Sequence, residues 1–393
     1  MNDPPTRNVS QCCFLLSWLS VSQRRYKKPK SKKYHSHSIF GAFRLVSYPP
    51  DFVFGSNSCW SSCRRSKTIL ISGATGCIGR QIWLQLMQHT NHRVKLIVRK
   101  DSLSKLDAAI WKKYSRRSQV WTVDLEDIRG LSHRLGEIDC AILAATSWGG
   151  SSAFAVNVDA TLQLVQWLPK HCHILYFSTA SIIDKDGFLL EEAYRFGTLY
   201  LQSKYVALQK LLALYPHRNI TVLFPTLVVG PHSHLADVVD SLTSWKRLLE
   251  HIYLDASAHF IHATDAAKIV VHFVNWNPKP SFYTCHRSNP TQKLPALILG
   301  QPCFTAEQLI QLVVARPPNH KTRWIPRIPI LSLFPPVLLS RILVWFGATV
   351  DPWVLYCLRK RHFVYPNAVA PEHFGLTSQW RHVSQLVHED GSS

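Results

Sequence analysis

The feature that most constrains this chain is an apolar run that ends in a glycine-rich turn. Residues 68–71 are apolar or β-branched, Ser72 ends the run, and Gly73, Gly76 and Gly79 follow. β-branched residues favour strands, and the apolar residues after the turn recur at helical spacing. A strand, a tight turn and a helix in this order let backbone amides approach a pyrophosphate at the helix N-terminus. The pattern therefore predicts a dinucleotide-binding unit. The turn residues expected to contact the ligand are Gly73, Thr75, Gly76, Cys77, Ile78, Gly79 and Arg80.

A second motif, further along the chain, is suited to proton transfer. Tyr200 and Lys204 stand four residues apart, so on a helix they share one face. A phenol with a pKa near 10 is a poor base, and a neighbouring ammonium can lower that pKa. Since an alcohol gives up hydride only as its hydroxyl proton leaves, this pair predicts hydride chemistry on an alcohol or a carbonyl.

Strands and helices are expected to alternate between the two motifs. Apolar or β-branched runs predict strands at 69–72, 94–98, 120–123, 140–145, 174–179 and 221–224, and helical spacing predicts a helix over 201–214. Such alternation predicts an α/β fold with a doubly wound parallel sheet, which binds its ligand at the carboxyl ends of the strands.

Further segments fit the same pattern and carry a family resemblance. They lie, in order, at 123–125, 144–146, 157–161, 176–179, 224–231 and 260–267. With the glycine turn and the Tyr/Lys pair, this chain resembles the extended short-chain dehydrogenase/reductase family, the NAD(P)-dependent epimerase/dehydratase type, over about residues 67–290. The resemblance implies a Rossmann-type domain followed by a smaller C-terminal substrate-binding lobe.

The resemblance also implies roles for individual residues. Tyr200 would move the proton, Lys204 would hold the cofactor ribose and acidify Tyr200, and Thr179 would hydrogen-bond the substrate oxygen. Further cofactor contacts are implied, beside those of Tyr200 and Lys204, at Asp124, Leu125, Ala144, Ala145, Thr146 and Pro225.

The end of the second predicted strand bears on cofactor choice. NAD-specific members of the family have an acid there, whereas this chain has Arg99 and Lys100, and Arg80 follows the last glycine. Cations at this position suit a 2′-phosphate, so NADP is expected. The alternative is NAD, with Asp101 acting as the acid.

The residues around Thr179 narrow the reaction. Family dehydratases follow the catalytic threonine with Asp-Glu, whereas Ala180 and Ser181 cannot eliminate water by acid–base catalysis. The family also has Arg where this chain has Phe224, which argues against a nucleotide sugar. The leading hypothesis is an NADP-dependent oxidoreductase of a secondary alcohol and its ketone. The alternatives are a nucleotide-sugar epimerase with retained cofactor and a non-catalytic cofactor-sensing protein.

Composition and charge suggest three segments: a basic extension (1–66), the cofactor-binding domain (67–230), and a substrate lobe with an apolar C-terminal region (231–393). The net charge is +21, but 1–66 hold eleven Lys and Arg against two Asp, which accounts for +9. The remaining excess suits phosphate-bearing small molecules, and no nucleic-acid partner is expected. The extension is taken as a disordered tail or an upstream start on a cytoplasmic protein, with an organelle transit peptide as the alternative.

Two other features of the sequence bear on partners and metals. The apolar region 324–350 is interrupted by prolines and Arg341, so ordinary core packing is expected and a membrane-spanning helix is not. A helix over 338–346 that caps a substrate or rests on a membrane surface, and a homodimer, stay open. The ten cysteines form no paired Cys-x-x-Cys set, which indicates a reducing compartment. The His-x-His pairs lack a second cluster, so no metal is expected.

Overall fold

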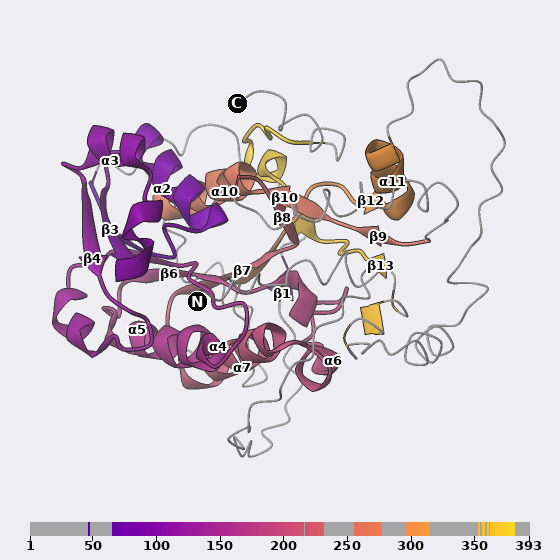
Figure 1. Cartoon of the computed structure of the whole chain (residues 1–393), viewed down its shortest axis with the longest axis horizontal. Coiled ribbons are helices and arrows are strands. Elements are labelled where there is room, and N and C mark those ends of the chain that lie inside the picture. The colour runs from indigo at the N-terminus through magenta and orange to yellow at the C-terminus, as the bar shows by residue number, and fades with distance from the viewer. Residues whose placement is uncertain are drawn as a thin grey trace, which may run out of the picture.

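A large parallel sheet forms the centre of the protein (Figure 1). The computed structural model describes residues 46–47, 65–215, 217–231, 255–276, 295–314, 353, 356–357, 360 and 362–381. The strands of the sheet in these residues are β1 (Val46–Ser47), β2 (Thr68–Ser72), β3 (Arg93–Val98), β4 (Ser118–Thr122), β5 (Cys140–Leu143), β6 (His173–Phe177), β7 (Ile220–Pro225), β11 (Pro295–Leu299) and β14 (Ala368–Val369). Their order is β1-β11-β7-β6-β5-β2-β3-β4, with β14 beside β11.

Every strand pair in this sheet is parallel, and the chain reverses its direction of winding between β2 and β5. In such a sheet the ligand binds in the crevice beyond the carboxyl ends of the strands, at this reversal. The predicted Rossmann-type doubly wound sheet is confirmed, and the glycine turn after β2 lies at the reversal.

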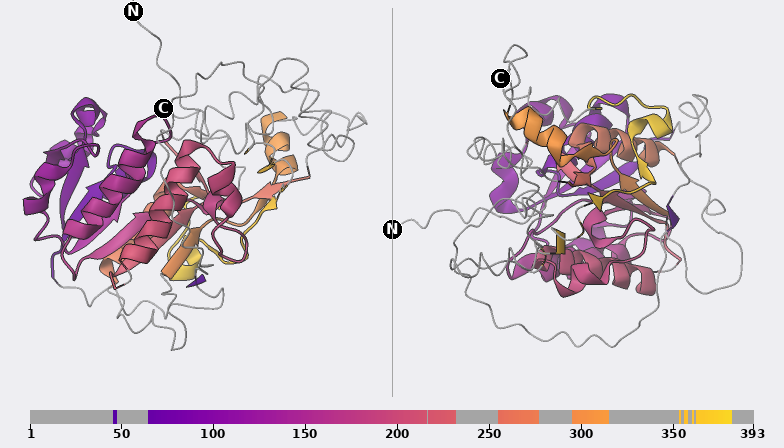
Figure 2. Two further views of the ribbon diagram at one scale, coloured as in Figure 1. Left: turned by 90° about the horizontal axis from the view of Figure 1, so that it is seen from below. Right: turned by 90° about the vertical axis from the view of Figure 1, so that its right-hand side faces the viewer.

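Helices cover both faces of the sheet. They are α2 (Cys77–His89), α3 (Ala108–Tyr114), α4 (Ser152–Phe154), α5 (Thr161–Trp167), α6 (Glu191–Arg195), α7 (Leu199–Leu214), α10 (Ala263–Asn275) and α11 (Ala306–Val314). Short 3₁₀ helices span Lys100–Lys105, Arg129–Arg134, Ala180–Ile182 and Pro371–Phe374, and a π-helix spans Ala155–Ala160. In Figure 1, α2 and α10 lie above the sheet and α4, α5 and α7 lie below it. The left view of Figure 2 shows the lower helices running alongside one another.

Burial explains why the strands read as continuous apolar runs. All residues of β5, β6 and β7 are buried, because helices pack on both sides of them. The core divides into two clusters, one on each face of the sheet. Ile69 and Ile71 belong to the cluster under α2 and α10, whereas Leu70 between them belongs to the cluster that contains the buried residues of α5 and α7. The alternation follows from the two-residue period of a strand.

A smaller set of strands lies beside one end of the sheet, at the right in Figure 1. It consists of β8 (Leu227–Val229), β9 (Ser257–Ala258), β10 (Phe260–His262), β12 (Phe304–Thr305) and β13 (His362–Phe363). β10 pairs with β8, and β9 pairs with β12 and β13. These strands follow β7 in the chain, where a substrate lobe was expected.

The chain beyond residue 230 also completes the main sheet. β11 pairs with β7, and α10 packs against α2 on the upper face. β1, from the basic extension, pairs with β11 through Val46 and Ser47. The main sheet therefore contains strands from all three predicted segments. Parallel pairing makes this possible, because it joins strands that are far apart in the chain. The limits of these segments stay predictions.

A buried carboxylate ties the last described segment to the upper face. Asp265, on α10, has a fully buried side chain that accepts hydrogen bonds from the backbone amides of Gln379 (2.9 Å) and Trp380 (3.1 Å). Lys268 lies 3.4 Å from the same carboxylate. The predicted apolar helix over 338–346 lies outside the described residues. No helix in the described part of the chain is long and apolar enough to cross a membrane.

Candidate active site

The turn between β2 and α2 has the geometry of a phosphate cradle. Gly73 has φ +81°, and a Cβ there would lie 2.6 Å from the backbone nitrogen of Ala145. A Cβ on Gly79 would lie 2.1 Å from the carbonyl oxygen of Gly73. Gly76 precedes α2, and no side chain caps the helix start. The first amides of α2 are therefore available to an anion, whose charge the helix dipole also favours.

The cradle opens into a cleft of about 520 Å³ beyond the carboxyl ends of the central strands. This volume is within the range of small-molecule sites. The predicted cofactor contacts that line it are Gly73, Thr75, Gly76, Cys77, Ile78, Gly79, Arg99, Leu125, Ala144, Ala145, Thr146, Tyr200 and Pro225. The cleft brings together residues from the ends of β2, β3, β5, β6 and β7, as the fold requires.

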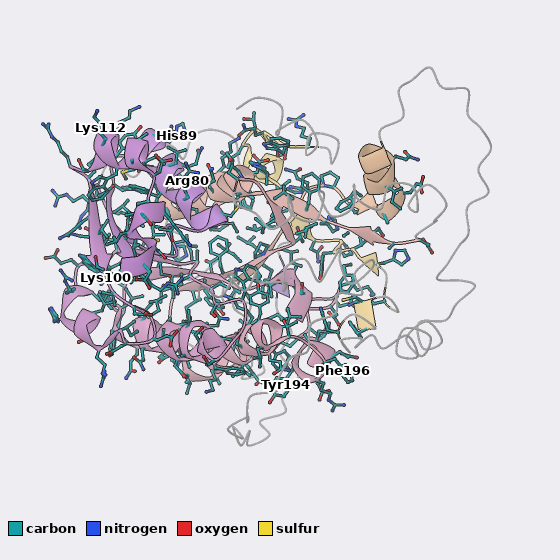
Figure 3. The ribbon with its side chains drawn as sticks, viewed as in Figure 1. Arg80, His89, Lys100, Lys112, Tyr194 and Phe196 are labelled. Carbon is teal, nitrogen blue, oxygen red and sulfur yellow. The ribbon has the colours of Figure 1, made fainter. Side chains whose placement is uncertain are left out.

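Three predicted contacts do not line the cleft. Arg80 forms an ion pair with Asp107, the N-cap residue of α3, and Figure 3 shows Arg80 on α2. Asp124 is exposed and accepts a hydrogen bond from the amide of Glu126 at 3.0 Å. Lys204 is buried beneath Tyr200, one helical turn further along α7. Their contacts with a cofactor stay predictions.

The end of β3 is cationic where it meets the cleft. Arg99 lines the cleft together with Ser102 and Lys105, both of which the sequence analysis missed. All three belong to the 3₁₀ helix that follows β3 or to its N-cap. No acidic side chain is among the described residues that line the cleft, and Asp101 is not one of them. This end of the cleft therefore attracts an anion.

Thr179 and Tyr200 form the centre of the site. Both residues are 7% exposed, and the Thr179 side chain lies close enough to the phenol to lower its pKa. Thr179 ends the turn after β6, where it also accepts a bond from the amide of Ser181, and Tyr200 lies in the first turn of α7. The buried helix face thus holds the phenol against the end of the central strand.

The electrostatics differ from expectation in one respect. Burial raises the pKa of Tyr200 above its ordinary value, and the neighbouring Thr179 side chain lowers that pKa by a smaller amount. Burial also lowers the pKa of Lys204 to about 7. The Lys204 ammonium donates to the carbonyl oxygen of Phe177 at 2.9 Å and lies 5.3 Å from the centre of the Tyr176 ring. The pKa of the Tyr200 phenol in this structure is therefore set mainly by desolvation and not by the Lys204 ammonium.

A loop residue that the sequence analysis missed packs against Tyr200. The ring centres of Trp148 and Tyr200 are 4.4 Å apart, and Trp148 lines the cleft. Asn157, fully buried in the π-helix, holds the loop: its side chain bonds both the amide and the carbonyl of Ser147, at 2.9 and 2.8 Å. The Nδ2 of Asn157 also donates to the hydroxyl of Ser203 on α7 at 2.9 Å. Asn157 therefore links the loop to the helix that carries Tyr200.

A buried hydroxyl supports a ligand in the cleft. Ser178 lines it, is 3% exposed, and its Oγ has no hydrogen-bond partner among the described residues. A buried hydroxyl without a partner is costly, and a bound group can remove that cost. Together with the glycine cradle and the cationic end of β3, it fits a dinucleotide.

A second, smaller pocket adjoins the cleft. It has a volume of about 60 Å³, and Tyr200 and Val228 line both cavities. Its other described lining residues are Thr179, Ala180, Ser181, Leu201, Thr226, Leu227, Ala258, His259, Trp353, Phe363 and Tyr365. The Tyr200 phenol therefore stands between a cleft that fits a dinucleotide and a pocket built partly by the smaller strands.

Fold and cleft together define a dinucleotide-binding protein of the doubly wound class. The profile of the NAD dependent epimerase/dehydratase family matches residues 69–284, and the chain belongs to this family. It is therefore an NAD(P)-dependent enzyme, as predicted. No curated protein sequence matches the chain at a significant level.

Solved structures of low sequence identity share the fold. The crystal structure of gox2253 superposes with a TM-score of 0.58 at 18% identity, over 82% of this chain and 96% of that one. A nucleoside-diphosphate-sugar epimerase from Pseudomonas aeruginosa, PA4631, gives 0.54 at 14% identity, over 82% and 95%. The terminal R domain from the myxalamid PKS-NRPS biosynthetic pathway gives 0.52 at 19% identity, over 78% and 82%.

Proposed function

We propose that this enzyme is an NADP-dependent oxidoreductase that interconverts a secondary alcohol and a ketone. The observation that carries the proposal is the position of Tyr200, which shares the adjoining pocket with Thr179 and also lines the cleft. A proton donor at this junction can reach a carbonyl oxygen bound in the pocket.

The chain's own residues would divide the work as follows. Thr179 would hydrogen-bond the substrate oxygen, and Tyr200 would give a proton to it or take one from it. Lys204, whose ammonium is bonded to the carbonyl of Phe177, would hold the ribose together with the end of β6. The glycine cradle and the amides of α2 would hold the pyrophosphate. When bound, the nicotinamide group supplies or accepts the hydride.

The state of Tyr200 favours one direction. A phenol is protonated at neutral pH and burial raises the pKa of Tyr200 further, so the side chain is in the form that can donate to a carbonyl. We therefore propose that ketone reduction is faster than alcohol oxidation near pH 7. Oxidation needs the phenolate and would gain from higher pH.

The preference for NADP rests on the cationic end of β3. Arg99 and Lys105 can pair with a 2′-phosphate, and Ser102 adds a hydroxyl on the same turn. Arg80 contributes less than the sequence suggested, since its guanidinium is paired with Asp107.

The experiment compares two tyrosines on α7. Tyr200→Phe should lower the rate of NADPH oxidation by ketones at least about a hundredfold, since general acid catalysis contributes 10² to 10⁴. The Kd for NADPH should change less than about twofold, because the phenyl ring still fills its place against Trp148. Tyr205→Phe is the matched control: Tyr205 is half-buried and stacks on Tyr194, 5.5 Å away, and its loss should leave the rate unchanged.

Two outcomes would contradict the proposal. Full activity in Tyr200→Phe, or an equal loss of NADPH binding, would remove the proposed role of the phenol. Cofactor that copurifies, never exchanges with free NADPH, and supports epimerisation of a nucleotide sugar would point instead to an epimerase, which uses the same three residues.

A further inference from the structure

The pocket beyond Tyr200 presents little free hydrogen-bonding capacity. Thr226 donates its hydroxyl to the carbonyl of Leu299 at 2.8 Å. Tyr365 donates its hydroxyl to the carbonyl of Ala180 at 2.7 Å. Both polar side chains line the pocket, yet each already donates its only hydroxyl proton to the backbone and can therefore only accept a further hydrogen bond.

The histidine in the pocket is satisfied in the same way. His259 Nε2 accepts from the backbone amide of Tyr365 at 3.1 Å, so Nδ1 carries the proton and donates to the carbonyl of Gln301 at 2.7 Å. Burial lowers the pKa of His259, which keeps this neutral form at pH 7. Both ring nitrogens are therefore occupied by protein groups.

The other polar side chains of the pocket lie on the two elements that carry Thr179 and Tyr200. Thr179 and Ser181 belong to the turn after β6, and Tyr200 lies on α7. The rest of the described lining is apolar or aromatic and includes Leu227, Trp353 and Phe363, and none of the described lining residues carries a charge. A substrate group in this pocket would find partners for one reacting oxygen and little else.

Volume limits the group further. An apolar cavity of about 150 Å³ holds a benzene ring of six carbon atoms. The pocket measures about 60 Å³, so in proportion it holds roughly two or three carbon atoms.

From these observations we infer the substrate class: ketones, and the matching secondary alcohols, in which one substituent of the reacting carbon is a short, uncharged alkyl group of about two or three carbons. This inference rests on the proposed function and adds which side of the substrate the pocket selects. A hydroxyl on that group would find no free donor in the side chains of Thr226, Tyr365 or His259, so its hydrogen-bonding capacity would be met only in part, which is costly for a buried group.

The test uses phenyl ketones that share one half and differ in the other. We expect kcat/KM with propiophenone to exceed that with hexanophenone at least about tenfold, because a five-carbon chain overfills the pocket. Butyrophenone and 3-hydroxypropiophenone form a nearly isosteric pair, and the hydroxylated member should be at least about tenfold poorer.

A pocket variant and a matched surface variant test the site itself. Leu227→Ala removes part of a half-buried side chain in β8 and should reduce the discrimination against hexanophenone about tenfold. Leu214→Ala makes the same change at a residue that is 59% exposed at the end of α7, and it should leave the ratio unchanged.

Binding measurements separate this inference from the proposed function. Calorimetric titration of 1-phenylpropanol and 1-phenylhexanol into the full-length enzyme with NADP reports size selection without turnover. If the protein binds the shorter alcohol more tightly but reduces no ketone, the proposed oxidoreductase activity is refuted, whereas the inferred size selection by the pocket is kept. The inference would be overturned if the short, long and hydroxylated ketones were used equally well, or if the two alcohols bound equally or not at all. It would also be overturned if Leu227→Ala left the ratio of propiophenone to hexanophenone activity unchanged.

Discussion

Replacing Gly79 by alanine sets two physical effects of opposite sign against each other. Gly79 is the third residue of α2, and helix propensity alone predicts that alanine there gains about 1 kcal/mol. The structure predicts the reverse. The new Cβ would lie 2.1 Å from the carbonyl oxygen of Gly73, which is 0.9 Å short of the 3.0 Å below which such contacts essentially do not occur.

The clash should decide the outcome, because its partner is backbone that cannot rotate away. Overpacking costs about 1–3 kcal/mol, and here the turn that forms the phosphate cradle must also shift. After the propensity gain we expect a net loss of up to about 2 kcal/mol. At about 2–4 °C per kcal/mol for a domain of this size, Tm should fall by up to about 4–8 °C.

Gly76→Ala is the control for this prediction. A Cβ at that position would lie 3.4 Å from the same oxygen, an ordinary contact, and the backbone φ of −84° suits any residue. Its Tm should fall by less than about 3 °C, since exchanging a glycine N-cap for alanine costs roughly 0.7 kcal/mol and no clash is added. Thermal unfolding by circular dichroism and NADPH titration by fluorescence measure both variants, and NADPH binding should weaken at least tenfold in Gly79→Ala. A Gly79→Ala protein that melts at or above the wild-type temperature would refute the steric argument.

Three further predictions concern buried or charged side chains. Lys204→Met should raise the Tm of the cofactor-free enzyme more at pH 6 than at pH 9. Burial lowers the pKa of Lys204 to about 7, so the buried charge destabilises the fold fully below that pH. The destabilisation decreases as the pH rises from there towards the pKa of lysine in the unfolded chain. An equal gain at both pH values would contradict this. Asp265→Ala should cost about 3 kcal/mol or more and lower Tm by about 6–12 °C, because two backbone amides and Lys268 lose a buried partner; a drop under 2 °C would show that the carboxylate is dispensable. Arg99→Glu should raise the Kd for NADPH at least tenfold and leave that for NADH within about threefold, and parallel titrations that change together would exclude a 2′-phosphate contact.

The local parts of the fold and site could be predicted because the sequence encodes them locally. A strand buried on both faces needs a continuous apolar run, as in Thr68–Ser72, and a turn that forbids a Cβ needs glycine, as at Gly73. The spacing of Tyr200 and Lys204 is a helical property, and the structure places both residues on α7. Such features depend on neighbours within a few residues, which a sequence shows directly.

Long-range relations could not be predicted in this way. β11 (Pro295–Leu299) pairs with β7, which lies about 70 residues earlier in the chain, and nothing within its own few residues specifies that pairing. Arg80 meets Asp107 only because α3 begins beside α2, and no pattern within a few residues of Arg80 indicates this ion pair. Trp148 follows a strand in an irregular loop, where no periodicity indicates the direction of a side chain. The raised pKa of Tyr200 likewise depends on burial that only the assembled structure provides.

The position of β11 between β7 and β1 has a consequence for synthesis on the ribosome. β7 is complete at Pro225, but its partner strand is not made until Leu299 has been added, so a nascent chain passes through a stage with one edge of the central sheet unpaired. Exposed strand edges are templates for association with other chains. During this interval the growing polypeptide is most exposed to aggregation, and chaperones that shield nascent chains should affect its yield most strongly when translation pauses between those two points.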